Sequence, residues 1–375
     1  MKRYGTWGVV VVVLVVAFIT AFSGKQDIAS DEPIRIGAII SQTGFAAAFG
    51  EMSQKGAQLA VDEINAAGGV DGRMVELLIE DDQTDPKVAA GLYQRMVGEG
   101  VPAIIGSNFD FVTQPVFALA ETGAAVVVSP SNPRIPGAFD TNARSFVMMS
   151  DFSTIIAALE PVLQQDTYTK FGVVRFDSAF SEEIVRNVDG MLAAHGKEPA
   201  VVETYKQLGG NDFRTTILKM QAAGVDMVFL DMIGTDSGVF LKQARELGYA
   251  PQVLAHVGLV DALRSEQFDV VLFEGVLMLD WNASPQSFQD AFVAAYGVAP
   301  TNSANRAYDA VYVLSQAIAE VGTDAGAIAT YLEETTFETP NGVFAFTKDH
   351  AVETTLVSLK TVRNGEFVEV ARLYE

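Results

Sequence analysis

A run of small and polar residues, SQTGFAAAFGE at 41–51, lies between an apolar segment and a long amphipathic one. A connection with no further role would be short and polar, whereas small residues let a ligand approach the backbone closely. The free N–H groups of a helix that begins here would face that ligand. The pattern therefore predicts a binding site at this junction.

Side chains that could catalyse a reaction or hold a metal are sparse. The chain has no cysteine, which excludes thiol catalysis, thiolate metal sites and disulfides, and its three histidines are far apart in the sequence. Asp81 and Asp82 follow an expected strand, and we interpret them as loop residues rather than metal ligands. A hydrolase using Asp110 with His256 stays an alternative, but no serine elbow, metal cluster or dinucleotide fingerprint accompanies that pair. We therefore expect no enzyme, no cofactor and no metal.

The elements that must position a ligand site are short apolar runs alternating with helical patterns from residue 34 onward. The expected strands are IRIGAII, VELLIED, PAIIGS, AAVVVSP, FGVVRF, AVVETY, VDMVFLD, PQVLAH, GVLMLD, FAFTKD and TTLVSLKTV. Strands separated by helices are joined by crossovers into parallel sheets. There are too many alternations for one comfortable sheet, so the sequence predicts an α/β protein with two similar lobes.

The composition sets the size of the core and limits the partners. Of the 375 residues, 49% are hydrophobic, which is ample for a sizeable core. The formal net charge is -22 at pH 7, and such a surface repels nucleic acid and anionic lipid headgroups. We therefore expect no nucleic-acid partner.

The N-terminus has the pattern of an exported protein. Lys2 and Arg3 precede an uncharged, valine-rich run at residues 4–24. Residues 1–24 are a signal peptide or a single membrane anchor, and the sequence leaves that choice open. Either one keeps the two basic residues in the cytoplasm and exports the rest, which begins with a polar tether at 25–33. We expect a periplasmic protein or one on the extracytoplasmic face of the cytoplasmic membrane.

An ordered set of segments resembles one known family. IRIGAIISQTGFAAAFGEMSQKGAQLAVDEINAAGGVDGR, ELLIEDDQTDPKVAAG, TQPV and VVVSPSNP are similar to the first lobe of type I periplasmic binding proteins. The greatest similarity is to the leucine/isoleucine/valine-binding group of ABC-transporter solute receptors. NDFRTTILKMQAAGVDMVFL and FLKQARELG resemble the second lobe of that group, and NRAYDAVYVLSQAI and NGVFAFTKDH resemble its return to the first lobe and its last crossing.

The resemblance implies two Rossmann-like lobes with parallel central sheets, joined by three hinge crossings. Lobe one would hold residues 34–149 and 282–343, and lobe two would hold residues 150–281 and 344–375. A small ligand would lie between the lobes, which close on it. In open parallel sheets ligands lie beyond the carboxyl ends of the strands, so the physical argument and the resemblance predict the same site.

In the first lobe the resemblance implies a wall built from several short stretches. Phe49 matches the aromatic residue that covers the apolar part of the ligand. A hydroxyl residue before TQP and groups after the SP of the next strand hold the carboxylate of an amino acid in the family. The groups after that strand are expected to be Ser129, Ser131 and Asn132, each placed to within one residue.

Asp110 is a departure from the family pattern. Alignment on TQP puts it where the family often has serine, and an ionised aspartate repels a carboxylate. Either Ser107 or Asn108 binds the carboxylate instead, or the ligand offers a donor to Asp110. An equal alternative is that Asp110 caps the helix FVTQPVFALA, and one residue can do both.

The second lobe contributes aromatic residues and a second departure. Phe180 matches an aromatic ligand contact, with core packing as its alternative, and Trp281 at the second crossing either stacks on the ligand or packs the hinge. The acidic residue that binds the ligand ammonium in the family is replaced by Val257. Asp231 or Asp110 would then take that role.

His256, next to Val257, is a further candidate for a ligand contact. A loop histidine in ordinary hydrogen bonding is its alternative. The resemblance thus predicts a receptor that passes a small ligand, by default a branched-chain or other amino acid, to a membrane ABC permease. A receptor or sensor for an amide, urea or an aromatic acid is the alternative, and the missing acidic residue at position 257 favours it.

Overall fold

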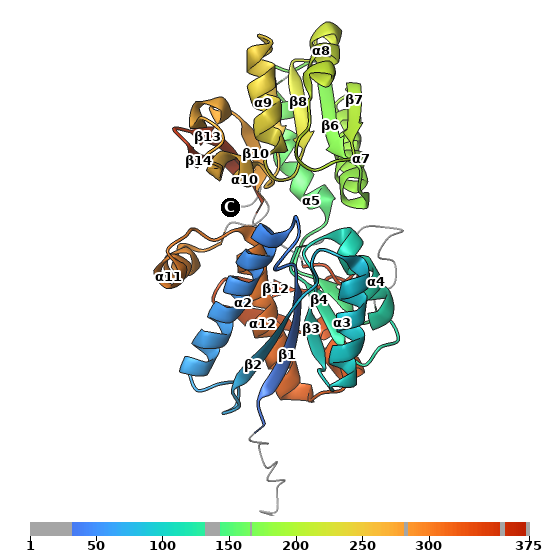
Figure 1. Cartoon of the computed structure of the whole chain (residues 1–375), viewed down its shortest axis with the longest axis vertical. Coiled ribbons are helices and arrows are strands. Elements are labelled where there is room, and N and C mark those ends of the chain that lie inside the picture. The colour runs from blue at the N-terminus through green and yellow to red at the C-terminus, as the bar shows by residue number, and fades with distance from the viewer. Residues whose placement is uncertain (1–31, 132–142, 166, 281–283, 353–356, 373–375) are drawn as a thin grey trace, which may run out of the picture.

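Residues 32–131, 143–165, 167–280, 284–352 and 357–372 are described by the structure, a computed structural model. They form two α/β lobes stacked along the long axis of the molecule (Figure 1). The fold class expected from the sequence is confirmed, since strands and helices alternate along both lobes. Residues 1–31, with the expected signal or anchor, lie outside the described residues. Among the described helices, none is long and apolar enough to cross a membrane.

The first lobe is made of two spans of the chain. The first span holds β1 (Ile34–Ile40), α2 (Ala47–Ala66), β2 (Val75–Asp81), α3 (Pro86–Gly98), β3 (Ala103–Ile105), α4 (Asp110–Ala120), β4 (Val126–Ser129) and β5 (Ser145–Val147). The second holds α11 (Gln286–Tyr296), α12 (Asn302–Val321), α13 (Ala325–Glu334), β11 (Thr336–Thr339) and β12 (Gly342–Ala345). The spans meet where α12 packs on α2. A Cβ on Gly56 would lie 1.9 Å from the carbonyl oxygen of Ala304, so only glycine allows this approach.

The second lobe follows the same plan and ends in a hairpin. Its main span holds α5 (Phe152–Ile156), η1 (Ala157–Leu159), α6 (Glu160–Leu163), β6 (Phe171–Phe176), α7 (Ala179–Ala194), β7 (Pro199–Tyr205), α8 (Arg214–Ala223), β8 (Met227–Asp231), α9 (Asp236–Glu246), β9 (Gln252–Ala255), α10 (Leu259–Arg264), η2 (Val270–Phe273) and β10 (Leu277–Asp280). The hairpin is β13 (Ser358–Arg363) and β14 (Glu366–Arg372). Asn364 and Gly365 turn it, both with positive φ, which is the backbone conformation that Asn-Gly favours in tight hairpins.

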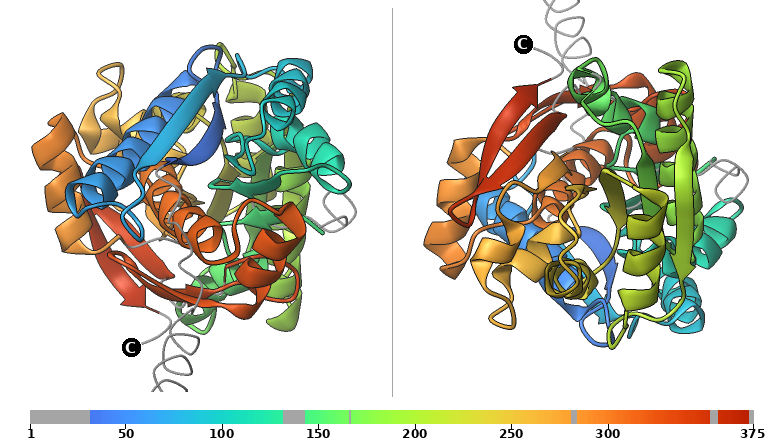
Figure 2. Two further views of the ribbon diagram at one scale, coloured as in Figure 1. Left: turned by 90° about the horizontal axis from the view of Figure 1, so that it is seen from below. Right: turned by 90° about the horizontal axis from the view of Figure 1, so that it is seen from above.

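Both sheets are parallel at their centres. The first has the order β2-β1-β3-β4-β5, and the second has the order β14-β13-β10-β9-β8-β6-β7. In the second sheet β13 pairs antiparallel with β10 and with β14, and this hairpin lies at one edge of the lobe (red in Figure 2). The burial of the strands explains their sequences. β1 is buried on both faces and reads as an apolar run interrupted only by Arg35, whereas the edge strand β7 alternates half-buried and exposed residues.

The chain crosses between the lobes three times, but the third crossing differs from the sequence expectation. The first crossing lies between β5 and α5, and the second lies between β10 and α11. Residues 344–352 were assigned to lobe two from the sequence, whereas the structure places them in lobe one. Ala351 pairs with Val147 beside β5, and Phe346 and Val352 are buried in the first-lobe core. The crossing therefore comes after residue 352, because these apolar side chains close the edge of the first lobe.

Candidate functional site

A small cavity lies between the two lobes, and we call it the inner cavity. Its volume is about 100 Å³. Its walls come from residues at the carboxyl ends of strands and the starts of helices in both lobes: Phe49, Asn108, Phe109, Asp110, Phe111, Ser131, Phe176, Ser178, Phe180, Ile233, His256, Val257, Gly258, Asn302, Ser303 and Arg306. The carboxyl ends of the two sheets therefore face one another across this cavity, as expected for a ligand site in parallel sheets.

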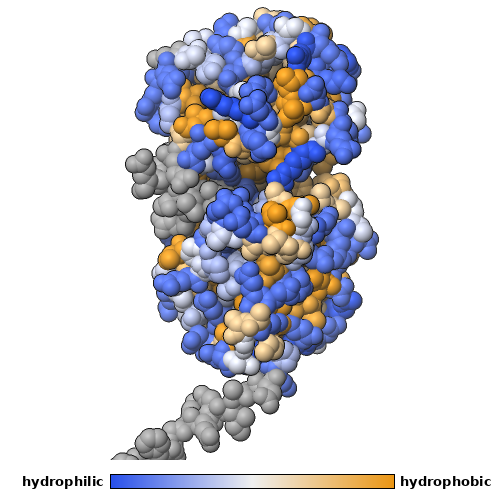
Figure 3. Space-filling model, turned by 90° about the vertical axis from the view of Figure 1, so that its left-hand side faces the viewer, coloured by the Kyte–Doolittle hydropathy of each residue, from blue (hydrophilic) through white to orange (hydrophobic). Residues whose placement is uncertain are grey.

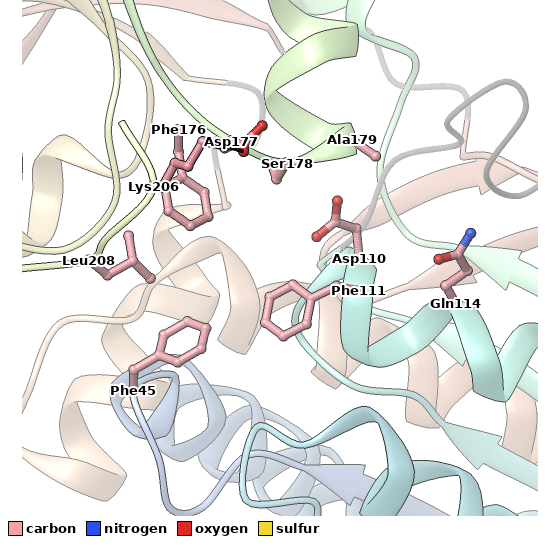
Figure 4. Close-up of a pocket in the computed structure, with 10 residues that line it drawn as sticks. All are labelled: Phe45, Asp110, Phe111, Gln114, Phe176, Asp177, Ser178, Ala179, Lys206 and Leu208. Carbon is pink, nitrogen blue, oxygen red and sulfur yellow. Dashed lines mark ion pairs between the residues drawn. The ribbon is translucent and has the colours of Figure 1, made fainter. Parts of the chain in front are cut away.

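A larger space, which we call the outer chamber, adjoins the inner cavity. Its volume is about 540 Å³, and it is lined by Phe45, Asp110, Phe111, Gln114, Phe176, Asp177, Ser178, Ala179, Lys206 and Leu208. Residues of the first lobe form one side and residues of the second lobe form the other (Figure 4). In the space-filling view the lobes meet at a narrowed waist, with hydrophobic atoms on both of its rims (Figure 3).

Arg306 is a charged residue that lines the inner cavity and was not expected from the sequence. It lies near the start of α12, and its side chain is 4% exposed. Its Nη1 donates to the carbonyl oxygen of Pro130 at 3.5 Å, while Nε and Nη2 have no hydrogen-bond partner among the described residues. Burial lowers the pKa of Arg306 to about 10, despite the opposing charge of Asp280, so the guanidinium is positive at neutral pH. A buried cation with two unused donors needs an anionic partner.

Asp280 does not satisfy Arg306. Its carboxylate lies 2.5 Å from Nζ of Lys360, and it also accepts a 3.4 Å hydrogen bond from Asn302. No ion pair within the described part of the chain includes Arg306. Guanidinium groups bind carboxylates through a planar fork of donors. Arg306 is therefore arranged to bind a carboxylate that enters the inner cavity.

Asn108 and Ser131, both predicted from the sequence, line the inner cavity beside Arg306. The Asn108 side-chain amide donates to Ser53 at 2.7 Å and to Ser131 at 3.0 Å, and Ser131 donates to Ser303 at 3.4 Å. The Asn108 Oδ1 atom is buried and has no partner among the described residues. This oxygen is available to accept a hydrogen bond from a ligand.

Asp110 occupies the inner cavity but does not cap its own helix, so the capping interpretation of this residue is wrong. Phe109 is the N-cap residue of α4, and Asp110 is the first helical residue. Its Oδ2 instead accepts a 3.0 Å hydrogen bond from the backbone N–H of Phe180, at the start of α7 in the other lobe. Burial raises the pKa of Asp110 above its usual value, and the backbone N–H groups of Phe180 and Phe111 oppose that change. The carboxyl group thus joins the two lobes across the cleft.

His256 lines the cavity, whereas Asp231 lies behind it. The backbone N–H of Gly258 donates to Nδ1 of His256 at 3.0 Å, so Nδ1 carries no proton. The proton is then on Nε2, which donates to Oδ1 of Asp231 at 2.8 Å. Asp231 is not among the residues that line the inner cavity. Asp231, expected from the sequence as a direct ligand contact, is separated from the cavity by His256, which lines it.

Of the remaining residues expected at the site, two phenylalanines line the inner cavity and two serines do not. Phe49 lines the cavity with its ring 5.4 Å from that of Phe109, and Phe180 lines it with its ring 6.0 Å from that of His256. The hydroxyls of Ser107 and Ser129 point elsewhere, and neither residue lines the cavity. Trp281 and Asn132 lie outside the described residues.

The Ser107 hydroxyl supports a loop instead of a ligand. It donates to Asp82 at 2.5 Å, and the same carboxylate accepts from Ser41 at 2.6 Å and from the backbone N–H of Thr84 at 2.8 Å. Asp81 in turn accepts from the backbone and hydroxyl of Thr43. The paired aspartates therefore hold the loop after β1, which positions Phe45 and Phe49.

Replacing Ser107 by alanine is expected to lower stability with little effect on ligand affinity. The change removes one hydrogen bond to a buried carboxylate, which costs about 1.5–3 kcal/mol of unfolding free energy. Chemical denaturation and calorimetric titration of the same sample measure the two effects. A loss of affinity greater than about threefold at unchanged stability would restore Ser107 as a ligand contact.

The comparison with known families decides how this cleft is classified. The model of a family described as periplasmic binding protein matches residues 33–366. The chain belongs to the periplasmic binding protein family. Its type I fold and its place in the leucine/isoleucine/valine-binding group, expected from the resemblance, are confirmed by the relatives and solved structures below.

Two relatives of this binding protein are similar over most of their length. The leucine-, isoleucine-, valine-, threonine-, and alanine-binding protein of Pseudomonas aeruginosa is 26% identical over 325 residues, which are 84% of this chain and 86% of the relative. The Leu/Ile/Val-binding protein BraC3 of Rhizobium johnstonii is 28% identical over 309 residues, 80% of this chain and 83% of the relative. Proteins of this family are solute-binding proteins.

Solved structures share the fold. The branched-chain amino acid transporter substrate binding protein LivJ of Streptococcus pneumoniae, solved with isoleucine, has a TM-score of 0.77 at 25% identity and covers 90% of this chain and 100% of its own. A solute binding protein of an R. palustris ABC transporter, solved with benzoate, has a TM-score of 0.77 at 20% identity, covering 91% of this chain and 96% of its own. The second likeness shows the fold alone.

Arg306 is the main site residue of this binding protein that sequence reasoning missed. The sequence did contain a signal: Arg306 and Asp309 are the two charged residues of NRAYDAVYVL, within a helix that otherwise has the apolar stripe of a core element. A charge on such a stripe is expected to be buried and therefore paired or functional. What the sequence lacked was the position of this helix beside the loop after β4.

Proposed function

We propose that this binding protein captures a small solute in the cleft between its lobes, catalyses no reaction, and passes the solute to a membrane ABC permease. The default ligand is a branched-chain or other amino acid. One observation carries this proposal: a buried cation, Arg306, and a buried carboxyl group, Asp110, line the same largely apolar cavity. An amino acid brings one charge of each sign and an apolar side chain.

The polar groups suggest how the ligand is oriented. Its carboxylate binds Nε and Nη2 of Arg306, which lack other partners among the described residues. Its ammonium lies against Asp110 and the unused Oδ1 of Asn108. This arrangement supplies the anionic partner that the family places at position 257, where this chain has valine. Each buried charge then has a partner of opposite sign, which removes most of the cost of burying it.

Closure of the lobes supplies the mechanism of capture. The hydrogen bond from the Phe180 backbone to Asp110 joins the lobes at the cavity wall, so it exists only when they are together. A ligand that contacts both lobes favours the closed state by its difference in affinity for the two states. We propose that the protein works on the extracytoplasmic side of the membrane, and that the closed, loaded form is the one that the permease recognises.

A second candidate is a receptor for an amide, urea or an aromatic acid. Val257 lines the cavity without offering a charge, and burial raises the pKa of Asp110. A neutral Asp110 needs no ammonium and can donate a hydrogen bond to a carbonyl oxygen. An aromatic acid would still use Arg306, whereas urea would not.

A thermal-shift panel on the purified protein, followed by calorimetric titration, tests the proposal. Leucine, valine, phenylalanine, benzoate, benzamide, urea and a polyamine are compared. A ligand that binds only the folded state raises the melting temperature by mass action. At a free ligand concentration of 100 times Kd, it adds about 2.7 kcal/mol to the free energy of unfolding. Stabilisation by amino acids alone supports the default, and stabilisation by benzoate or benzamide alone supports the second candidate. No stabilisation by any compound contradicts both.

A further inference from the structure

Exposed aromatic rings gather at the mouth of the cleft. Within the described residues, Phe45 and Phe111 are the two phenylalanines that are more than a third exposed, at 51% and 37%. Their rings stack at 5.9 Å with an interplanar angle of 22°, and both lie close to the ring of Phe109, at 5.3 and 6.0 Å. Large exposed apolar surface at one place indicates a binding function.

The second lobe completes this surface. Phe176 and Leu208 face the space that Phe45 and Phe111 border from the first lobe (Figure 4). The charged residues at the rim neutralise one another, since Lys206 Nζ lies 3.3 Å from the carboxylate of Asp177. The outer chamber therefore offers apolar walls from both lobes, and among its lining residues the one charged side chain without an ion pair is Asp110, where the chamber joins the inner cavity.

The outer chamber is continuous with the inner cavity. Asp110, Phe111, Phe176 and Ser178 line both spaces. Of the polar partners of the proposed ligand head, Arg306 and Asn108 line the inner cavity alone, and Asp110 lies where the two spaces join. A ligand held there by its carboxylate can extend its apolar part past Phe111 and Phe176, into a chamber of about 540 Å³.

We infer that the ligand is larger than a branched-chain amino acid and carries an aromatic or extended apolar group that lies between Phe45, Phe111, Phe176 and Leu208. This inference rests on the proposed function, because it extends the ligand outward from the same inner cavity. The inner cavity holds the charged head, and closure of the lobes brings the four apolar side chains around the tail. Short aliphatic ligands leave this surface in water and bind more weakly.

Calorimetric titration of the purified protein with a graded series tests the inference. The series is L-leucine, L-phenylalanine and L-homophenylalanine, with 4-phenylbutanoate as the form of the last that lacks the ammonium. Each methylene buried contributes roughly a fourfold gain in affinity. L-Phenylalanine and L-homophenylalanine are therefore expected to bind at least about tenfold more tightly than leucine.

Variants of the outer chamber make the test specific. Phe45→Ala and Leu208→Ala are each expected to weaken the phenyl ligands about fivefold to tenfold and leucine less than about twofold. Phe45 is exposed, so its removal leaves the core intact. Leu218→Ala, on the exposed face of α8, is the matched control for Leu208→Ala and is expected to leave all affinities unchanged.

The outcomes separate this inference from the function on which it rests. Leucine binding as tightly as the phenyl ligands, or equal losses for leucine and phenyl ligands in the Phe45→Ala variant, overturns the inference and leaves the proposed function intact. No binding by any member of the series overturns both.

Discussion

Replacing Arg306 by glutamine will abolish measurable binding of carboxylate ligands while leaving the protein folded. In the proposed ligand complex, the guanidinium and the ligand carboxylate form a buried, hydrogen-bonded charge pair. Removal of one member of such a pair costs about 2–5 kcal/mol, which is roughly 30-fold or more in Kd. Titration calorimetry with the best ligand of the panel measures this loss.

The same substitution is expected to maintain or raise the stability of the ligand-free protein. Burial lowers the folded pKa of Arg306 from its ordinary range to about 10, so the folded state disfavours the charged form. Below pH 10 the Arg306 side chain is charged in both the folded and the unfolded states. Burial of this charge therefore lowers the free energy of unfolding, by an amount on the order of 3 kcal/mol, throughout that pH range. Glutamine removes the charge and with it most of this cost.

Two further variants control the Arg306 experiment. Arg306→Lys keeps the charge but loses the planar fork, so it is expected to retain part of the affinity. Arg186→Gln removes an exposed arginine that pairs with Glu183 on α7, and it is expected to leave affinity unchanged. If Arg306→Gln lowers the melting temperature and preserves affinity, then Arg306 is a structural residue.

Replacing Asp110 by asparagine is expected to weaken amino acids by about tenfold to 100-fold and to spare the corresponding acids that lack the ammonium. Asparagine retains an oxygen that can accept from the Phe180 backbone, so the link between the lobes survives and only the charge is lost. A charged hydrogen bond contributes about 1.5–3 kcal/mol. Titrations with phenylalanine and with 3-phenylpropanoate separate the two effects.

Asp110→Ala removes the link between the lobes as well as the charge. It is expected to weaken both ligands, because the closed state loses the hydrogen bond to Phe180. Asp324→Asn is the matched control, since Asp324 caps α13 far along the chain by accepting from the backbone N–H of Ala327 at 2.8 Å. It should lower stability by about 1 kcal/mol or less without changing affinity. Equal losses for both ligands in Asp110→Asn would contradict an ammonium contact.

The pH dependence of the Asp110 effects has opposite signs for stability and for binding. Burial raises the folded pKa of Asp110 above its unfolded value near 3.8, so the folded state binds the proton more tightly. The protonated Asp110 side chain therefore contributes to the free energy of unfolding below pH 3.8, and this contribution is lost as pH rises through the raised pKa. Amino-acid affinity should increase over that same window, because the ammonium prefers the ionised carboxylate. Asp110→Asn should flatten both curves.

The sequence by itself determined the class of fold and the place of the site. Apolar runs such as IRIGAII, separated by helical patterns, require crossovers and hence parallel sheets. The carboxyl ends of parallel strands share one edge, so the residues that follow them had to meet there. For this reason Phe49, Asn108, Ser131, Phe180 and His256, each expected from the sequence, do line the inner cavity.

Tertiary structure alone decided which side chains face the ligand and which support the walls. The Ser107 hydroxyl points away because Asp82, 25 residues earlier, lies within hydrogen-bond distance. Asp110 contacts Phe180, 70 residues later, in the other lobe. Arg306 reaches the loop after β4 from 176 residues away because Gly56 lets α12 approach α2. Spacing along the chain reports local periodicity, whereas these directions depend on contacts made only after distant segments pack together.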